Sequence, residues 1–298
     1  MKILLTGANG FIGNEIARLY KGHSKTIGLD TDSVDRHGNV DFYSPMVLPS
    51  PDLEGLINTF EPDLCFHCAG SASVPHSMSQ PAGDFQSGPV VVFNLLDSIR
   101  KTNSRCKIIF FSSAAVYGAP LSLPITESSP LAPISPYGYH KMMCEQLLDE
   151  YRKLFGVFSI VLRVFSCYGE GLRKQLLWDM GQKIKTGELN LFGTGEETRD
   201  FIHVADVARA ADHLAKTAQN GDVYNVATGR SVTIREVAEQ MIHSSGKSSL
   251  RPKFNNQVKP GDPTRWQVDI TRLQKSGFVP SVDLADGILK YCRWLESL

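Results

Sequence analysis

Short apolar runs alternate with amphipathic stretches over the first 165 residues of the chain. Continuous apolar runs predict strands at residues 3–5, 26–29, 40–43, 64–68, 108–112 and 158–165. Helical spacing of apolar residues predicts helices at residues 11–20, 53–60, 90–102 and from 136 past 151. Strands that alternate with helices form crossover units, and strands without polar alternation suit burial on both faces. The pattern therefore predicts an α/β fold with a doubly wound parallel sheet.

The regular alternation fades after residue 165, where glycine, threonine and charged residues become more frequent. Short amphipathic pieces remain at residues 176–186, 234–244 and 284–295. They predict a smaller α+β lobe. We expect the main domain to span 1–165, with a return of the chain near 204–228, and the lobe to span 166–203 and 229–298.

Composition excludes several classes of protein. The 298 residues contain 31 Lys and Arg and 31 Asp and Glu, so the net charge of zero argues against a nucleic-acid binder. No apolar run approaches the roughly 18–20 residues of a membrane span, and the start of the chain predicts no secretion signal. Cys65 and Cys68 form a lone C-x-x-C without a second pair, so we expect no metal site. The six cysteines are expected as free thiols in a reducing cytoplasm.

Glycines in a G-x-x-G-x-x-G pattern, Gly7, Gly10 and Gly13, lie between the first predicted strand and the first helix. Glycines let a backbone approach a pyrophosphate closely, and a helix N-terminus offers it free N–H groups. Asp30 follows Gly10 by 20 residues, the distance expected for a carboxylate that holds the adenosine ribose. A carboxylate there repels the additional phosphate of NADP, and Arg36 lies too far along the chain for a phosphate clamp. The loop therefore favours NAD.

Tyr137 and Lys141 lie four residues apart on a predicted helix, so they share one face. Ser113 ends a predicted strand, and strand ends in an open parallel sheet border the ligand crevice. An ammonium group near a phenol stabilises the phenolate, which can take a proton from an alcohol or return it. Ser113 would bind the same alcohol oxygen, while a nicotinamide exchanges the hydride.

Several stretches of the sequence resemble one family, the extended short-chain dehydrogenases/reductases that act on nucleotide sugars. The matching stretches cover essentially the whole chain and read T-G-A-N-G-F-I-G (6–13), F-H-C-A-G (66–70), S-S-A-A-V-Y-G (112–118), S-P-Y-G-Y-H-K (135–141), L-R-V-F-S-C-Y-G (162–169), G-T-G-E-E-T-R-D-F-I-H-V-A-D-V (193–207), Y-N-V-A-T-G (224–229) and K-P-G-D (259–262). The resemblance implies a Rossmann domain that binds NAD and a C-terminal lobe that binds a nucleoside-diphosphate sugar.

The resemblance also implies a role for individual residues. The catalytic trio would be Ser113, Tyr137 and Lys141. Residues that match the family's coenzyme site are Gly7, Asn9, Gly10, Phe11, Ile12, Gly13, Asp30, Ala69, Tyr137 and Lys141. Residues that match its substrate site are Ser113, Ser166, Arg199, Lys259 and Asp262. Lys259 replaces a common arginine and Ser166 a common asparagine.

Members of this family share a first step, oxidation at C4 of the sugar. Dehydratases use an Asp-Glu pair directly after the serine, and this chain has Ala114 and Ala115 there, which cannot move protons. Asp30 and the S-S-A-A-V-Y-G string favour an NAD-dependent UDP-hexose 4-epimerase. A short segment at 169–175 resembles that of some reductases of GDP- or dTDP-4-keto-6-deoxyhexoses, which use NAD(P)H. A family member that binds NAD without activity is the third alternative.

Aromatic residues lie on the two long predicted helices and indicate core packing or a subunit interface; they are Phe85, Phe93, Tyr139 and Tyr151. By analogy with the family, we expect these helices to pair in a homodimer. His67 is expected to pack within its strand, and His140 to lie on a pocket wall or the surface.

Overall fold

The computed structural model describes residues 1–102, 105–257 and 265–298. The chain forms two compact units. The first unit contains Met1–Gly118, Pro130–Val164 and Ala208–Tyr224. The second contains Ala119–Ser129, Phe165–Val207 and Asn225–Leu298.

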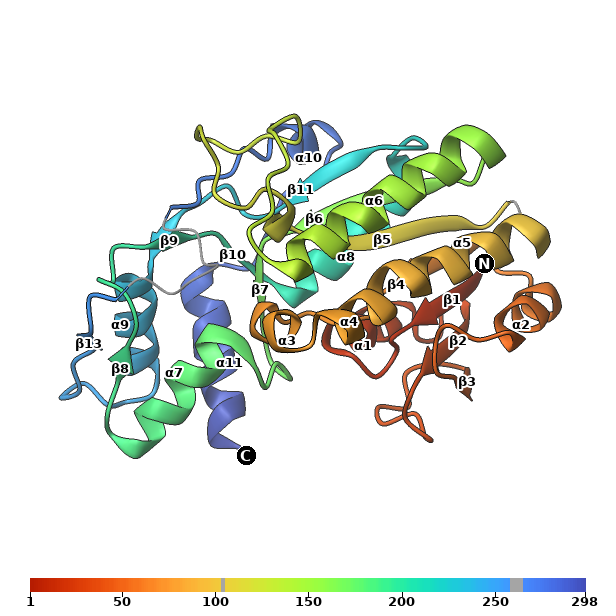
Figure 1. Ribbon diagram of the computed structural model, residues 1–298. Coiled ribbons are helices and arrows are strands. Elements are labelled where there is room, and N and C mark those ends of the chain that lie inside the picture. Colours follow the sequence, from red (N-terminus) through yellow and green to blue (C-terminus); the bar gives the residue numbers. More distant parts are fainter. Residues whose placement is uncertain (103–104, 258–264) are drawn as a thin grey trace. The chain divides into compact units, whose positions relative to one another are not determined.

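A sheet of seven strands, counted over the described residues, organises the first unit (Figure 1). In spatial order its strands are β11 (Val223–Val226), β6 (Ser159–Val164), β5 (Lys107–Ser113), β4 (Leu64–His67), β1 (Lys2–Thr6), β2 (Lys25–Asp30) and β3 (Phe42–Pro45). The pairings from β6 through to β3 are parallel. The chain winds one way from β1 to β3 and the other way from β4 to β6, so the order reverses between β1 and β4. Ligands bind at such a reversal, beside the carboxyl ends of the strands.

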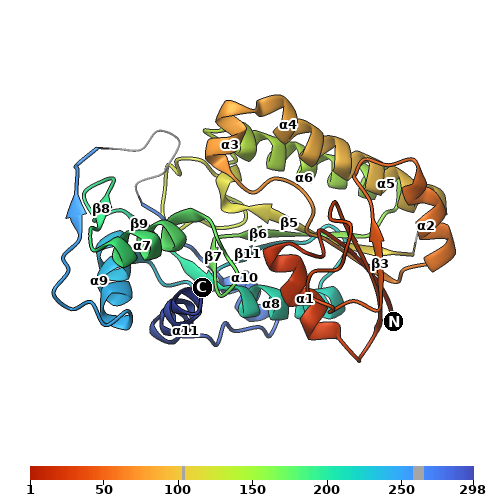
Figure 2. The same ribbon diagram turned by 90° about the horizontal axis from the view of Figure 1, so that it is seen from below.

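Helices cover both faces of this sheet, as Figure 2 shows. On one face lie α2 (Asp52–Phe60), α5 (Val91–Thr102) and α6 (Pro136–Phe155); on the other lie α1 (Phe11–Tyr20) and α8 (Val204–Thr217). The central strands are buried because both faces are covered, and all six residues of β6 are buried. The edge strand β3 has no buried residue. This architecture confirms the predicted doubly wound α/β fold.

The helix predicted at residue 90 begins earlier in the structure. After α3 (Val74–Ser79) and α4 (Pro81–Phe85), a wide π-helical turn, η1 (Gln86–Val90), leads directly into α5. Pro89 lies inside this turn and has no N–H to donate, so the regular α-helical bonding is interrupted there. The turn lies against α6, so the interruption faces the helix that carries Tyr137 and Lys141.

Both ends of α6 are determined by local sequence. The side chain of Ser135 accepts a hydrogen bond from the N–H of Gly138 at 3.2 Å, and Pro136 is the first helical residue. Gly156 ends the helix with a φ of 71°, a conformation that glycine adopts without strain. The N-terminal cap fixes the first residue of α6, and Lys141 lies five residues after it.

The second unit consists of short strand pairs and helices. Its paired strands are β7 (Ser166–Tyr168) with β10 (Phe201–His203), β9 (Thr198–Arg199) with β12 (Val232–Thr233), and β8 (Asn190–Leu191) with β13 (Lys253–Phe254). Its helices are α7 (Gln175–Thr186), α9 (Ile234–Ser244), α10 (Thr271–Lys275) and α11 (Leu284–Glu296).

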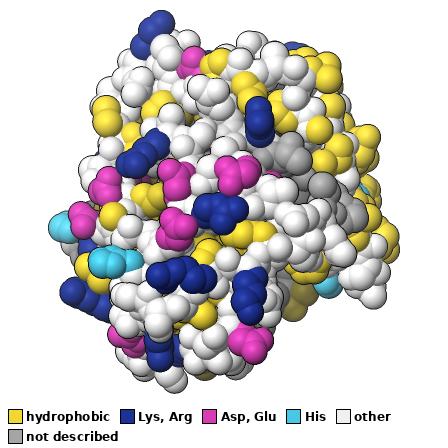
Figure 3. Space-filling view, turned by 90° about the vertical axis from the view of Figure 1, so that its left-hand side faces the viewer, with side chains coloured by type: hydrophobic (Ala, Val, Ile, Leu, Met, Phe, Trp, Pro, Cys, Tyr) yellow, Lys and Arg dark blue, Asp and Glu magenta, His cyan; other side chains and the backbone are white. Residues whose placement is uncertain are grey.

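The face seen in Figure 3 carries basic and acidic side chains intermingled rather than gathered by sign. That mixture agrees with the net charge of zero. Within the described part of the chain, no helix is both long enough and apolar enough to cross a membrane.

Candidate active site

The loop between β1 and α1 can be formed only with glycine at its key positions. Gly7 has a φ of 73°, and a Cβ there would lie 2.8 Å from the backbone nitrogen of Ala69. A Cβ at Gly13 would lie 2.0 Å from the carbonyl oxygen of Gly7. Gly10 precedes α1, and no side chain caps its first turn. Such a bare helix N-terminus behind a glycine cradle fits a pyrophosphate.

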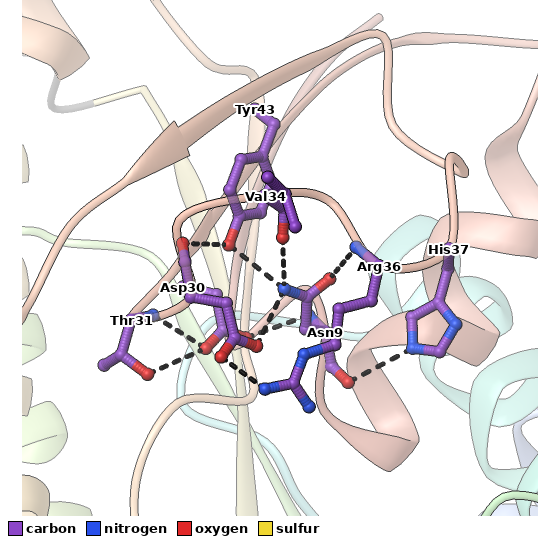
Figure 4. A network of polar contacts seen from close by, with 8 residues as sticks. Asn9, Asp30, Thr31, Val34, Arg36, His37 and Tyr43 are labelled. Carbon is purple, nitrogen blue, oxygen red and sulfur yellow. Dashed lines mark hydrogen bonds and ion pairs between the residues drawn. The ribbon is translucent and has the colours of Figure 1, made fainter.

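Asp30, at the end of β2, lies beside this loop (Figure 4). One oxygen of its carboxylate accepts a hydrogen bond from the N–H of Asn9 at 2.9 Å, and the other accepts one from the N–H of Thr31 at 2.7 Å. The carboxylate is therefore fixed next to the phosphate loop. This is the position from which it can bind ribose hydroxyls, so the residues present fit NAD.

The side chain of Asn9 connects the loop to the segment after β2, as Figure 4 shows. Its amide nitrogen donates to the carbonyl of Val34 at 2.9 Å and to the carboxylate of Asp32 at 3.0 Å. Its amide oxygen accepts from the N–H of Arg36 at 3.0 Å. The guanidinium of Arg36 pairs with Asp32. Although Arg36 lies far along the chain from Asp30, the fold brings it to the same network, where an acidic partner offsets its charge.

Tyr137 and Lys141 both project from α6 into one pocket of the first unit. The ammonium nitrogen of Lys141 donates to the carbonyl of Phe111 at 2.8 Å and lies 4.7 Å from the ring centre of Phe110. The ring centre of Tyr137 is 6.0 Å from the same nitrogen. β5 thus holds the lysine through a backbone carbonyl and an aromatic face.

Ser113 is the last residue of β5 and the N-cap of the short helix η2 (Ala114–Val116). Its hydroxyl oxygen accepts a hydrogen bond from the N–H of Ala115 at 3.2 Å. The described contacts include none between this hydroxyl and Tyr137. Ser113 therefore lies on the strand that anchors Lys141, and its hydroxyl hydrogen remains available for another acceptor.

The pocket around Tyr137 and Lys141 is lined by residues from β4 and the segment that follows it, and from α4, η1, α5, β5 and α6. Among them His67 is 2% exposed, and its Nδ1 is 2.7 Å from the hydroxyl of Thr6. Burial, together with the positive charge of Lys141, lowers the pKa of His67 to about 3. His67 is therefore neutral near pH 7, as expected for a packed strand residue. Burial raises the pKa of the Cys144 thiol, which also faces the pocket, to about 12.

Two residues that match the family's substrate site, Ser166 and Arg199, lie in the second unit, whereas Ser113 lies in the first. Ser166 is in β7, where its N–H donates to the carbonyl of Asp200 at 3.0 Å. Arg199 is in β9 and is 9% exposed, and its guanidinium lies 5.6 Å from the ring centre of Trp266. Lys259 and Asp262 lie outside the described residues.

All six cysteines carry free thiols. Burial raises the pKa values of Cys65 and Cys68 well above the usual range, so both thiols stay protonated. Among the described residues, no group of histidine, cysteine, aspartate or glutamate side chains could hold a metal ion.

One residue of the pocket had no signal in the sequence. Asp84, in α4, is 2% exposed and pairs with His140, the residue before Lys141. The pair is 56 residues apart in the chain, so neither spacing nor periodicity could indicate it. His140 does form part of a pocket wall, with a carboxylate partner.

The chain is similar to a known protein family and to solved structures of nucleotide-sugar epimerases. The model of the NAD dependent epimerase/dehydratase family matches residues 3–227. A UDP-glucose 4-epimerase of Azospirillum brasilense is 30% identical over 325 residues, which cover 100% of this chain and 92% of that protein. A UDP-N-acetylglucosamine 4-epimerase from Methanobrevibacter ruminantium superimposes with a TM-score of 0.91 at 30% identity, covering 99% of this chain and 98% of that one. A UDP-glucose 4-epimerase from Thermotoga maritima, solved with UDP-glucose, also gives 0.91, at 27% identity and with 100% and 99% covered.

Proposed function

The chain belongs to the NAD-dependent epimerase/dehydratase family, and on that premise we propose that it is a 4-epimerase of a UDP-hexose. Like the nucleotide-sugar epimerases that it resembles, it is an NAD-dependent enzyme. One observation carries the proposal: Tyr137 and Lys141 converge in a pocket that Ala69 also lines, and Ala69 lies against the glycine loop. A proton-transferring phenol and a coenzyme cradle thus meet at one edge of the sheet.

Each residue of the trio has a distinct task. Tyr137 takes the proton from the C4 hydroxyl as the sugar is oxidised and returns it when the sugar is reduced. Lys141, anchored on the carbonyl of Phe111, stabilises the phenolate that does this. Ser113 donates its hydroxyl hydrogen to the same sugar oxygen and fixes its position. NAD, when bound, supplies the hydride chemistry that side chains cannot.

The residues after Ser113 argue against elimination of water. Ala114 and Ala115 form the start of η2, and Ala114 is 1% exposed. Neither side chain can act as an acid or base, so the ketone formed at C4 has no local group to remove a neighbouring proton. Return of hydride to the opposite face of the ring is the remaining outcome that needs no second substrate.

The second unit is proposed to bind the UDP part of the substrate, and the first to bind NAD. Ser166 and Arg199 are the described residues assigned to the diphosphate. Lys259 would add a positive charge there, and Asp262 is assigned to the nucleotide. Arg199 suits this task because a guanidinium binds phosphate oxygens in a bidentate manner. Its burial against Trp266 fixes its direction before substrate arrives.

The direct test is to incubate the purified protein with UDP-galactose and no added coenzyme, and to follow UDP-glucose. We expect conversion, and we expect Tyr137→Phe to lower kcat about a hundredfold or more because the proton acceptor is lost. Tyr139→Phe is the matched control, since Tyr139 is 46% exposed on the same helix, and it should keep wild-type activity. Turnover only with NADPH and a 4-keto sugar would identify the reductase instead. No turnover of either substrate would favour the third alternative, a family member that binds NAD without catalytic activity.

A homodimer through α5 and α6 is also proposed, because large apolar side chains are exposed there. Phe93 on α5 is 50% exposed, and Tyr139 and Phe155 on α6 are 46% and 47% exposed. Phe93→Asp should halve the mass measured by sedimentation equilibrium. An unchanged mass would contradict this interface. The free thiols support a cytoplasmic location, where they stay reduced.

A further inference from the structure

An aspartate and a histidine that the mechanism does not use lie beside the catalytic pair. Asp84 comes from α4, and His140 comes from α6, three residues after Tyr137 and one before Lys141. Nδ1 of His140 is 2.6 Å from Oδ2 of Asp84. The ring of Phe85 packs edge-on against His140 at 5.4 Å. The bond therefore ties α4 to the same part of α6 that carries the phenol and the amine.

The second oxygen of Asp84 is left without a partner. Asp84 is 2% exposed, and its Oδ1 has no hydrogen-bond partner among the described residues. An unpaired buried acceptor costs about 1–3 kcal/mol, so it requires an explanation other than packing. Asp84 and Lys141 line the same pocket. A nearby positive charge is the compensation that a buried carboxylate needs.

The other titratable groups of the pocket do not supply that charge. His67 from β4 is neutral near pH 7, because burial lowers its pKa to about 3. Cys144 from α6 stays a thiol, because burial raises its pKa to about 12. The pocket residues from η1 and β5 are Gly88 and Phe110, which do not titrate. The carboxylate of Asp84 therefore has His140 as its bonded partner, and Lys141 is the lysine that lines the same pocket.

These charged groups line one small pocket, with a volume of about 10 Å³. Charges near a protein are screened less than in bulk water, so a carboxylate in this pocket acts on the other groups that line it.

We propose that Asp84 and His140 form a positioning pair for Tyr137 and Lys141. His140 fixes the carboxylate of Asp84, and the negative charge of that carboxylate keeps the amine of Lys141 protonated and sets the pH range in which Tyr137 exchanges its proton. Neither residue touches the reacting atoms. The proposal rests on Tyr137 and Lys141 as the catalytic pair, but not on which sugar is the substrate.

The test measures the titration of Tyr137 without substrate. Protein labelled with ¹³C at the tyrosine ring carbon that bears the hydroxyl is titrated by NMR, and Tyr137→Phe identifies the signal. Asp84→Asn keeps the shape of the side chain and removes its charge. Removing a negative charge favours deprotonation nearby, so the midpoint for Tyr137 should move to lower pH by about half a unit to one unit. Both limbs of the kcat–pH profile should move in the same direction.

Variants of His140 separate charge from packing. His140→Leu removes the donor that fixes the carboxylate of Asp84, so the midpoint of Tyr137 should move in the same direction as in Asp84→Asn. The double variant, Asp84→Asn with His140→Leu, should show no further shift of the Tyr137 midpoint, because Asp84→Asn alone already removes the charge that His140 fixes. His140→Gln retains a donor and should retain the wild-type midpoint. Additive shifts in the double variant would contradict the pairing.

Asp97→Asn is the matched control, because it removes the same charge from α5 at a site paired with Arg100 and Lys101. It should leave the midpoint unchanged. A folded Asp84→Asn protein with the wild-type midpoint would overturn the inference. If the midpoint shifts but UDP-galactose is not converted, the positioning pair stands and the proposed activity fails.

Discussion

Protonation of His67 is predicted to limit the stability of the fold in mild acid. His67 lies in β4, all of whose residues are buried, with its ring stacked 5.9 Å from that of Phe110 and its Nδ1 bonded to Thr6. Burial and the charge of Lys141 lower its pKa from 6.5 to about 3. The native protein therefore excludes a proton that the unfolded chain binds.

The sign and size of the effect follow from linkage. Between pH 6.5 and pH 3 the unfolded chain carries a proton at His67 and the folded chain does not, so the free energy of unfolding falls as the pH falls. A shift from 6.5 to about 3 corresponds to about 5 kcal/mol once both states are protonated, and to about 2 kcal/mol already at pH 5. This contribution is fully present above pH 6.5.

Urea unfolding of wild type and His67→Gln at pH 7.5, 6 and 5 measures this contribution. The variant loses the contact with Thr6 and will be less stable at pH 7.5. The two proteins are therefore compared by how steeply their free energies of unfolding change with pH. Wild type should lose about 2 kcal/mol more than the variant between pH 7.5 and pH 5. His23→Gln, at an exposed histidine, is the control and should follow wild type. Equal slopes for wild type and His67→Gln, or an NMR titration of His67 near pH 6.5 in the folded protein, would refute the reasoning.

Three further predictions concern the coenzyme loop and the core. Asp30→Ser should lower the affinity for NAD about tenfold and reduce the ratio of NAD affinity to NADP affinity, as measured by calorimetric titration. An unchanged ratio would contradict a contact between Asp30 and the ribose. Gly13→Ala places a Cβ 2.0 Å from the carbonyl oxygen of Gly7, so the loop must open. The affinity for NAD should fall at least tenfold. An affinity equal to that of wild type would show that the loop does not hold the coenzyme. In the native structure the buried guanidinium of Arg163 lies 2.8 Å from the carboxylate of Glu145. Glu145→Gln removes this counter-charge and should lower the free energy of unfolding, measured with urea, by about 3–5 kcal/mol. A loss below about 1 kcal/mol would contradict this.

The sequence by itself determined six strands of the main sheet, the loop and the active helix, whereas the strand β11 emerged only from the structure. Strands buried on both faces leave an uninterrupted apolar signal, and glycines at Gly7 and Gly13 are forced by contacts between backbone atoms. The caps of α6 lie within a few residues of its ends, and helical geometry places Tyr137 and Lys141 on one face. These features depend on short-range rules, so a single chain is enough to predict them. The roles assigned to individual residues remain predictions for the experiments above.

Only the tertiary structure decided which side chains meet across elements. Asp84 reaches His140, and Arg163 reaches Glu145, because the winding of the sheet brings distant segments together. Only the structure separates the buried from the exposed aromatic residues of the long helices. Tyr151 is 3% exposed and belongs to the core, while Phe93 is 50% exposed. Burial and charge depend on neighbours from every side, and spacing and periodicity along the chain do not indicate which distant residues those neighbours are.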